Sequence, residues 1–403
     1  MTVSGSSVRN KPFGVATTLV LLASAFSAAL LWQAGARAQG APDSLEAVIV
    51  ELSTADKVGQ LLMAGFSGID AAGAGSAIRE LRVGGIVLGD GRNATQTREA
   101  TDQLQAMARE AELPPLLVSI DQEGSPVQPI HEGVTTFVSN WVIGQIQPPS
   151  LGRETACVRG ATHGRELAGL GIQMNLAPVL DVWDNAKNTV IAMRSFSNDP
   201  AIAARLGAAY VEALQGQGVL AVGKHFPGHG SSSEDSHISL PVVGHDRAWL
   251  ESHELIPFRA AINAGVAAIM TDHVSYPAID RGALQPASLS ATIVTGMLRD
   301  DLGFDGLVLT DDIGEMKAIT TKYEPGEAAV EALLAGSDML IVVGPLESQR
   351  RMAQAITAEI GGRIPEARLE ASVRRVLVAK QQAGLFGPAR PPPSPKLTSC
   401  TAP

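Results

Sequence analysis

Fifteen residues near the middle of the chain carry a high density of groups that can move protons. The stretch GKHFPGHGSSSEDSH, residues 223–237, holds three of the eight histidines, together with Lys224, Asp235 and three glycines. Imidazole has an ordinary pKa of about 6.5, so a histidine can donate and accept a proton near neutral pH. Asp235 lies two residues before His237, and an aspartate beside an imidazole fixes its tautomer and stabilises the protonated ring. The pattern predicts a proton-transfer pair on a loop that glycine and serine residues allow to move.

Metal binding is the second chemistry that these histidines could serve. His225, His229 and His237 could ligate zinc. The chain has no H-E-x-x-H sequence and no cysteine-rich spacing, and Lys224 would place another cation beside the ion. A serine hydrolase is favoured still less, because no G-x-S-x-G sequence follows an expected strand. We therefore expect no metal and no organic cofactor.

These residues need a scaffold that brings them together. Between residues 45 and 386, short apolar runs alternate with longer amphipathic stretches, which is typical of βα units with parallel strands. Eight strands are expected, at 61–66, 84–89, 115–121, 173–180, 219–226, 266–273, 304–311 and 338–344. Eight is the number in a (β/α)8 TIM-type barrel, so we predict an α/β fold with a single catalytic domain over residues 45–386. A doubly wound open sheet is the alternative, but the glycine-rich AGFSGIDAAGAG lacks the G-x-G-x-x-G spacing typical of that fold.

Polar residues fall repeatedly where the expected strands end. They are Asp121, Lys224, His225, Asp272, His273, Asp311 and Asp312. Barrel enzymes carry their chemistry at this face, because the carboxyl ends of all eight strands meet there. Several carboxylates beside hydroxyl-binding donors suit sugar chemistry, in which retaining glycosidases use a carboxylate nucleophile and a second group that gives and takes a proton.

The ends of the chain bear on its compartment. Arg9 and Lys11 precede an uncharged apolar run over residues 13–32, and small residues flank Arg37. We expect residues 1–38 to be a signal peptide cut after Ala38, with export to the periplasm, the cell wall or the medium; an uncleaved membrane anchor is the alternative. A formal net charge of −10 disfavours nucleic acid and anionic membrane surfaces as partners.

The last residues and the two cysteines are less informative. Residues 387–403 are rich in proline and serine, and we expect a disordered tail. Cys157 lies on an expected helix and Cys400 in that tail. An exported pair could form a disulfide, but the sequence does not decide between a bond and two thiols. It also leaves the oligomeric state open.

Two long motifs resemble glycoside hydrolase family 3, specifically its single-domain β-N-acetylglucosaminidases, or β-hexosaminidases. The motifs are GKHFPGHGSSSEDSH and GFDGLVLTDD. Shorter matches extend the resemblance over about residues 55–345; they are DKVGQLLMAGF, VGGIVL, IDQEG, LAPVLDV, RSFSNDP and PASLS. The resemblance implies that Asp311 is the nucleophile, that His237 is the acid/base and that Asp235 is its partner. It implies that the sugar is held by Asp121, Arg194, Lys224 and His225. Asp312 and His229 are expected to shape the site.

The resemblance also implies an activity. It points to a retaining exo-β-N-acetylglucosaminidase that removes terminal non-reducing N-acetylglucosamine from peptidoglycan fragments or related glycans through a covalent glycosyl-Asp311 intermediate. Two alternatives stay open. One is a family 3 β-glucosidase or phosphorolytic relative, because a neutral histidine tolerates an incoming phosphate better than a carboxylate does. The other is a barrel that binds wall sugars without cleaving them.

Three features depart from the family pattern. Gly124-Ser125-Pro126-Val127 stands where the family usually has G-G-R-V, and one extra residue lies between Asp311 and Met316. Asp272 stands where alanine is common. We expect Asp272 to add a negative charge near the pocket, which would raise the pKa of Asp311 or alter the preferred sugar.

Overall fold

A computed structural model describes residues 45–66, 74–387 and 400. The expected signal peptide, residues 1–38, lies outside the described residues. Within the described ranges, no helix is both long enough and apolar enough to cross a bilayer.

Eight parallel strands form the centre of the molecule. They are β1 Leu62–Phe66, β2 Gly85–Leu88, β3 Leu117–Ile120, β4 Met174–Asn175, β5 Leu220–Phe226, β6 Ala268–Thr271, β7 Leu307–Thr310 and β8 Leu340–Val343. Each strand from β1 to β6 pairs with the next, and β8 pairs with β1. Between β7 and β8 the amide of Thr310 donates to the carbonyl of Met339 at 3.1 Å, and the amide of Ile313 donates to the carbonyl of Ile341 at 3.1 Å. These bonds close the sheet, so the predicted (β/α)8 barrel is confirmed.

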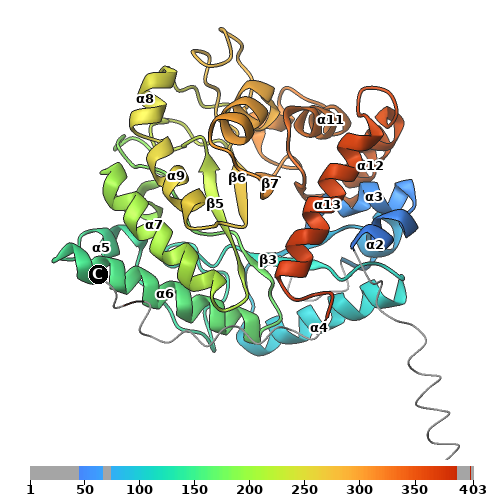
Figure 1. Ribbon diagram of the computed structural model, residues 1–403, viewed down its shortest axis with the longest axis horizontal. Helices are drawn as coiled ribbons and strands as arrows, with labels where there is room; N and C mark the ends of the chain where they lie inside the picture. The colour runs from blue at the N-terminus through green and yellow to red at the C-terminus, as the bar shows by residue number, and fades with distance from the viewer. Residues whose placement is uncertain (1–44, 67–73, 388–399, 401–403) are drawn as a thin grey trace, which may run out of the picture. The chain divides into compact units, whose positions relative to one another are not determined.

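Helices surround the strands, as Figure 1 shows. The α-helices are α2 Leu45–Glu51, α3 Thr54–Gln60, α4 Ala94–Glu110, α5 Asn140–Gly144, α6 Pro149–Gly169, α7 Pro200–Gln215, α8 Arg247–Ser252, α9 Leu255–Asn263, α10 Lys317–Thr320, α11 Pro325–Ala335, α12 Leu346–Glu359 and α13 Glu366–Gln382. Two π-helical segments span Ala77–Leu81 and Thr292–Asp301, and two short 3-10 helices span Ala192–Arg194 and Ala287–Leu289. Asn93 caps α4: its side chain accepts a hydrogen bond from the amide of Gln96 at 2.9 Å.

The strand β4 is much shorter than the apolar run that predicted it. Pro178 has no amide hydrogen, so the regular ladder cannot continue through it. The segment nevertheless stays beside β5, because the amide of Lys224 donates to the carbonyl of Pro178 at 3.1 Å and the amide of Leu180 donates to the carbonyl of Lys224 at 2.6 Å. The end of β5 and the turn after β4 are thereby fixed next to each other.

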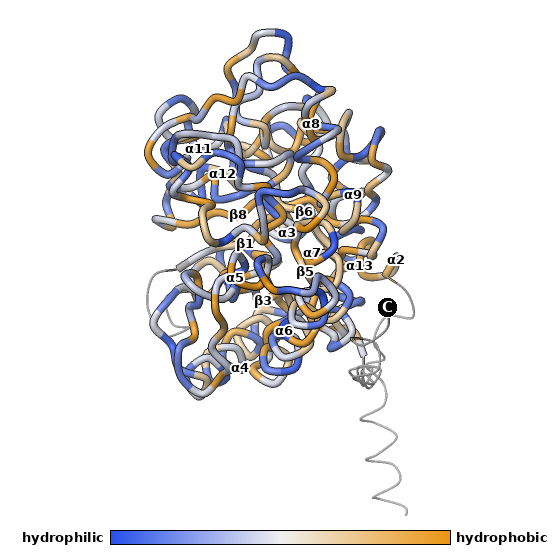
Figure 2. Tube along the Cα trace, turned by 90° about the vertical axis from the view of Figure 1, so that its left-hand side faces the viewer, coloured by the Kyte–Doolittle hydropathy of each residue, from blue (hydrophilic) through white to orange (hydrophobic). Residues whose placement is uncertain are grey.

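The strands are continuous apolar runs in the sequence because both of their faces are buried. Every residue of β3, β5, β6 and β7 is buried, as expected for a parallel sheet covered by helices on one face and filled by side chains on the other. In Figure 2 the interior strand segments are mainly hydrophobic, whereas hydrophilic stretches are more frequent in the outer loops.

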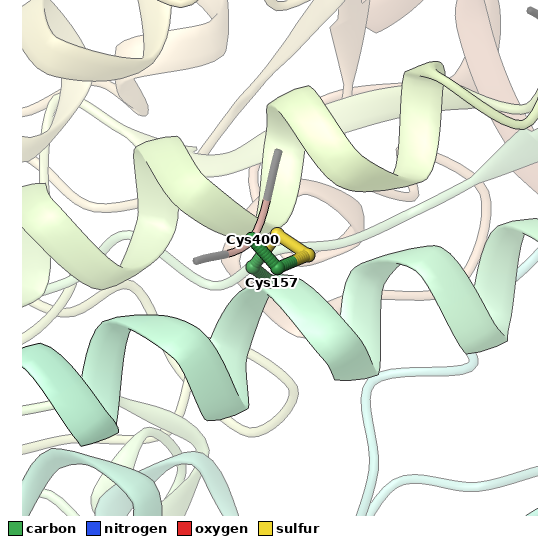
Figure 3. The surroundings of a disulfide bond; sticks show 2 residues. All are labelled: Cys157 and Cys400. Carbon is green, nitrogen blue, oxygen red and sulfur yellow. A yellow bond between two sulfur atoms is a disulfide. The ribbon is translucent and has the colours of Figure 1, made fainter. Parts of the chain in front are cut away.

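A disulfide joins Cys157 on α6 to Cys400, across 243 residues of sequence (Figure 3). The two cysteines pack against Ala209 and Ala213 of α7, and both are 5% exposed. The disorder expected for residues 387–403 therefore does not extend to Cys400. The remainder of that tail beyond Gly387 lies outside the described residues.

Candidate active site

A cavity of about 400 Å³ opens at the carboxyl ends of the strands. It is lined by residues that follow β2, β3, β5 and β7, by the end of β8 and by the turn at residues 190–194. Six of the seven predicted site residues line it, namely Asp121, Arg194, Lys224, His225, His237 and Asp311. The seventh, Asp235, does not line the cavity but contacts His237.

Asp311 follows β7 directly, and its surroundings favour the ionised carboxylate. Burial alone would raise its pKa, but the nearby His225 and His273 and the amide of Asp312 outweigh burial and lower the pKa below its usual value. That amide donates to Asp311 Oδ1 at 2.8 Å. An ionised carboxylate is the form that a nucleophile requires.

The two cations at the predicted sugar-binding positions are fixed by carboxylates. Lys224 Nζ lies 2.5 Å from Asp121 Oδ1 and 2.7 Å from Glu123 Oε1. Arg194 makes two contacts with Glu123, from Nη2 to Oε1 at 2.8 Å and from Nε to Oε2 at 2.9 Å. Burial would raise the pKa of Glu123, but Arg194 and Lys224 together lower it to about 2.

Glu123 was missed at the sequence level. It stands in the IDQEG motif two residues after Asp121, and that position near a strand end was the one available signal. Its side chain is 2% exposed and contacts both Arg194 and Lys224. We therefore infer that Glu123 orients these two cations and offers little surface to a ligand.

His225 is oriented by another residue that the sequence reading missed, Asp181. His225 Nδ1 lies 2.7 Å from Asp181 Oδ2, and the amide of His229 donates to Asp181 Oδ1 at 2.7 Å. Burial opposes ionisation of Asp181, but His225 and His229 lower its pKa. Because Asp181 occupies Nδ1, the other ring nitrogen of His225 is the one directed to Arg194, at 3.4 Å from Nη2.

The predicted proton-transfer pair is formed at the rim of the cavity. His237 Nδ1 lies 2.7 Å from Asp235 Oδ1, which also accepts a bond from the amide of His237 at 2.8 Å. Burial would raise the pKa of Asp235, but these two groups lower it. The His237 side chain is 63% exposed. Holding Nδ1 leaves Nε2 to exchange a proton with a bound ligand or water.

His229 has partners that suit loop shaping. Its Nδ1 lies 2.9 Å from Ser232 Oγ and its Nε2 lies 3.1 Å from Ser236 Oγ. Burial and the neighbouring His225 lower its pKa to about 4, so the ring is neutral at pH 7. Among the described residues, no group of three or more His, Cys, Asp and Glu is arranged to hold a metal ion; the absence of a metal or cofactor stays a prediction.

The two remaining acids have different environments. Asp312 accepts bonds from the amides of Val343, Gly314 and Glu315 at 2.7, 2.9 and 2.9 Å, so it shapes the loop after β7, as predicted. The expectation for Asp272 is wrong. Asp272 is fully buried outside the cavity lining, and burial raises its pKa well above the usual value. Burial therefore favours the neutral form of Asp272, and the pKa of Asp311 is lowered rather than raised.

The divergent loop after Glu123 turns back on itself. The amide of Gly124 donates to the carbonyl of Val127 at 3.1 Å, and the amide of Ser125 donates to the carbonyl of Phe137 at 3.1 Å. The buried Arg159 of α6 donates to the carbonyl of Glu123 and, at 2.8 Å, to Asn140 Oδ1. These bonds keep Asp121 and Glu123 at the cavity although the loop sequence departs from the family pattern.

Known proteins are similar to this chain in sequence. Residues 53–379 match the family model described as the glycosyl hydrolase family 3 N terminal domain. "Beta-hexosaminidase A" of Pseudoalteromonas piscicida is 36% identical over 321 residues, which cover 74% of this chain and 53% of that protein. "Beta-hexosaminidase LpqI" of Mycobacterium tuberculosis is 34% identical over 341 residues, which cover 82% of this chain and 83% of that protein.

A solved structure aligns over most of the barrel. The glycoside hydrolase family 3 beta-N-acetylglucosaminidase from Paenibacillus sp. str. FPU-7 matches with a TM-score of 0.78 and 43% identity, over 83% of this chain and 63% of that one. The chain thus spans about half of the Pseudoalteromonas protein and less than two thirds of the Paenibacillus chain.

Proposed function

Since this chain belongs to glycosyl hydrolase family 3, we propose that it is a retaining exo-β-N-acetylglucosaminidase that releases terminal non-reducing N-acetylglucosamine. The observation that carries the proposal is one cavity lined by both a half-buried carboxylate whose pKa is lowered, Asp311, and the acid/base candidate His237. A sugar ring bound between them would meet both groups that a retaining mechanism needs. The name of the Paenibacillus protein supports N-acetylglucosamine as the sugar, and the names of the other two relatives support a hexosaminide.

The reaction proceeds in two steps. Asp311 attacks the anomeric carbon and forms a glycosyl ester, while His237 Nε2 gives its proton to the departing glycosidic oxygen. A water molecule then loses a proton to His237 and attacks the same carbon, and the bond to Asp311 breaks. Asp235 stabilises the imidazolium form of His237 between proton transfers. Asp121, Arg194, Lys224 and His225 bind the hydroxyl groups of the sugar.

The wider setting of the reaction is also a proposal, and it rests on the expected export of the chain. We propose peptidoglycan fragments or related glycans as substrates, in the periplasm, the cell wall or the medium. The Cys157–Cys400 disulfide supports an oxidising compartment, because disulfides persist there and are rare in the cytosol.

Phosphorolysis is the second candidate, because the proposed acid/base is a histidine at the exposed rim. A neutral imidazole does not repel an incoming phosphate as a carboxylate would. Turnover of 4-nitrophenyl N-acetylglucosaminide and of the matching glucoside, each with and without phosphate, separates the candidates. We expect the first substrate to be cleaved without phosphate and to yield free N-acetylglucosamine. Cleavage of the glucoside alone, or a sugar phosphate as the main product, would overturn the proposal, and binding without turnover would favour a sugar-binding barrel.

A further inference from the structure

Two buried carboxyl groups that the mechanism does not use lie beneath the loop that carries His237. Asp272 follows β6, and Glu254 immediately precedes α9. Both are 0% exposed, and neither lines the cavity. We propose that Asp272 and Glu254, each as a neutral carboxylic acid acting through one hydroxyl group, position the acid/base loop, residues 227–239. The inference rests on the proposed role of His237.

Asp272 reaches the loop through Tyr276. The hydroxyl of Tyr276 lies 2.8 Å from the carbonyl oxygen of Gly228 and 2.7 Å from Asp272 Oδ2. A hydroxyl has one proton, and a carbonyl oxygen can only accept. Both contacts are full hydrogen bonds when Asp272 is protonated, donates to Tyr276 and lets Tyr276 donate to Gly228. The other oxygen of Asp272 accepts from the amide of Val274 at 3.0 Å, which orients the carboxyl group.

Glu254 repeats this arrangement through Ser231. Ser231 Oγ lies 2.9 Å from Glu254 Oε1 and 2.9 Å from Asp184 Oδ1. The Ser231 hydroxyl has one proton and cannot donate to two carboxylates, so either Glu254 or Asp184 must be a protonated carboxylic acid that donates to Ser231. Glu254 is the buried member, whereas the Asp184 side chain is 26% exposed and lies 3.6 Å from His253 Nε2. A protonated Glu254 therefore donates to Ser231, which donates to Asp184.

The electrostatic surroundings agree with this proton count. Burial raises the pKa of Glu254 well above its usual value, and the nearby Asp181 and Asp184 raise it further. Burial raises the pKa of Asp272 in the same way, and Asp181 and Asp311 add to the effect. A neutral acid avoids the large cost of burying an unpaired charge.

Two glycines of the loop lie so close to the barrel that a larger residue would clash at either position. A Cβ atom on Gly228, where φ is +140°, would lie 2.5 Å from Glu254 Oε2, and one on Gly230 would lie 1.8 Å from the carbonyl oxygen of Val182. Asn188 Nδ2 also donates to the carbonyl of His229 at 2.8 Å. The base of the loop, residues 228–232, is therefore docked on the barrel.

His229 transmits this position to the acid/base pair. Its ring bridges Ser232 at the base of the loop and Ser236, which lies between Asp235 and His237 in sequence. A loosened base would therefore displace His237, while Asp311 stays fixed by the amide of Asp312.

Leaving-group dependence provides the test. We would measure kcat/KM for 2,4-dinitrophenyl N-acetylglucosaminide, whose departure needs no proton, and for a methylumbelliferyl or chitobiose substrate, whose departure does. We expect Tyr276→Phe and Ser231→Ala to lower kcat/KM at least tenfold for the second class and less than threefold for the first. Tyr210→Phe is the matched control, because this buried hydroxyl contacts His163 and Asn175 away from the loop; it should produce no such split.

Conservative variants separate positioning from folding. Asp272→Asn and Glu254→Gln keep a donor toward Tyr276 and Ser231 and an acceptor toward the backbone, so they should retain the wild-type ratio of the two kcat/KM values. Asp272→Ala and Glu254→Ala should reproduce the split, with melting temperatures recorded for every variant. An equal loss on both substrates, no loss in any variant, or a split in the amide variants as large as in the alanine variants would overturn the inference. A wild-type protein inactive on both substrates would instead refute the proposed function.

Discussion

At the scale of single residues, the site is built from charges that neutralise one another before a ligand arrives. Glu123 binds both Arg194 and Lys224, and Asp181 binds His225. These carboxylates preorganise the donors, so a bound sugar need not order them. Asp311 differs from them because no ion pair joins it to a lysine or arginine within the described residues, which leaves its charge free for the proposed attack on the sugar.

Glu123→Gln tests the buried charge network. The pKa of Glu123 is lowered from 4.5 to about 2, so its ionisation stabilises the fold above pH 4.5, and that contribution is lost as the pH falls toward 2. We expect the variant to lose about 3–5 kcal/mol of unfolding free energy at pH 7, because two buried cations lose a partner. Between pH 4.5 and 2, the stability of the variant should also fall less steeply than that of the wild type.

Urea unfolding at several pH values measures both effects. Glu370→Gln is the matched control, because Glu370 pairs with Lys57 at the surface and is 49% exposed; it should cost less than about 1 kcal/mol. A Glu123 variant as stable as the wild type, with the same pH dependence, would contradict the structural role assigned to this residue.

Local sequence patterns identified the proposed reacting groups, whereas they did not identify the residues that orient the rest of the site. Asp235 and His237 are two residues apart, and Asp311 ends an apolar run, so local patterns reveal them. Asp181 and Glu123 were missed because their partners lie 44 and 71 residues away. The effect of Asp272 on the pKa of Asp311 was predicted wrongly for a similar reason, since the burial of Asp272 and its contact with Tyr276 depend on the whole fold.

At the scale of elements, apolar runs predicted all eight strands, because both faces of a barrel strand are buried. They could not predict the length of β4, which depends on the proline after it. The amphipathic stretches of the sequence did not reveal that Lys380 of α13 is 0% exposed. Its Nζ lies 2.5 Å from Gln60 Oε1 of α3.

Lys380 should make stability depend on alkaline pH. Burial lowers its pKa from 10.5 to about 7, so the unfolded chain binds more protons than the folded one between these values, and stability rises with pH across that range. We expect Lys380→Met to remove this rise, whereas the exposed Lys317→Met should retain it. Denaturant unfolding at pH 7, 8, 9 and 10 measures the difference; parallel curves for the wild type and Lys380→Met would contradict the assignment.

At the scale of the whole molecule, the disulfide ties α6 to a residue near the end of the sequence. The sequence could not decide whether this bond forms, because the distance between two cysteines separated by 243 residues depends on the entire fold. The bond lies beside α7, and neither cysteine lines the cavity. Its role is therefore expected to be stability.

Cys157→Ser/Cys400→Ser tests this role. Opening the closed loop should lower the unfolding free energy by about 2–5 kcal/mol, since the unfolded chain gains conformational freedom. At temperatures where the variant is folded, its kcat/KM should match the wild type. Thermal unfolding with and without reductant, alongside activity, provides the measurement; unchanged stability, or activity lost by the folded variant, would show that the bond has another role.

The central claim, that Asp311 forms a covalent bond to the sugar, can be tested by trapping. A 5-fluoro-N-acetylglucosaminyl fluoride should inactivate the enzyme, and mass spectrometry of its peptides should locate the sugar on Asp311. Asp311→Asn should neither be labelled nor hydrolyse an activated substrate, while sugar binding stays detectable. A label on another residue, or an Asp311→Asn variant as active as the wild type, would contradict the account.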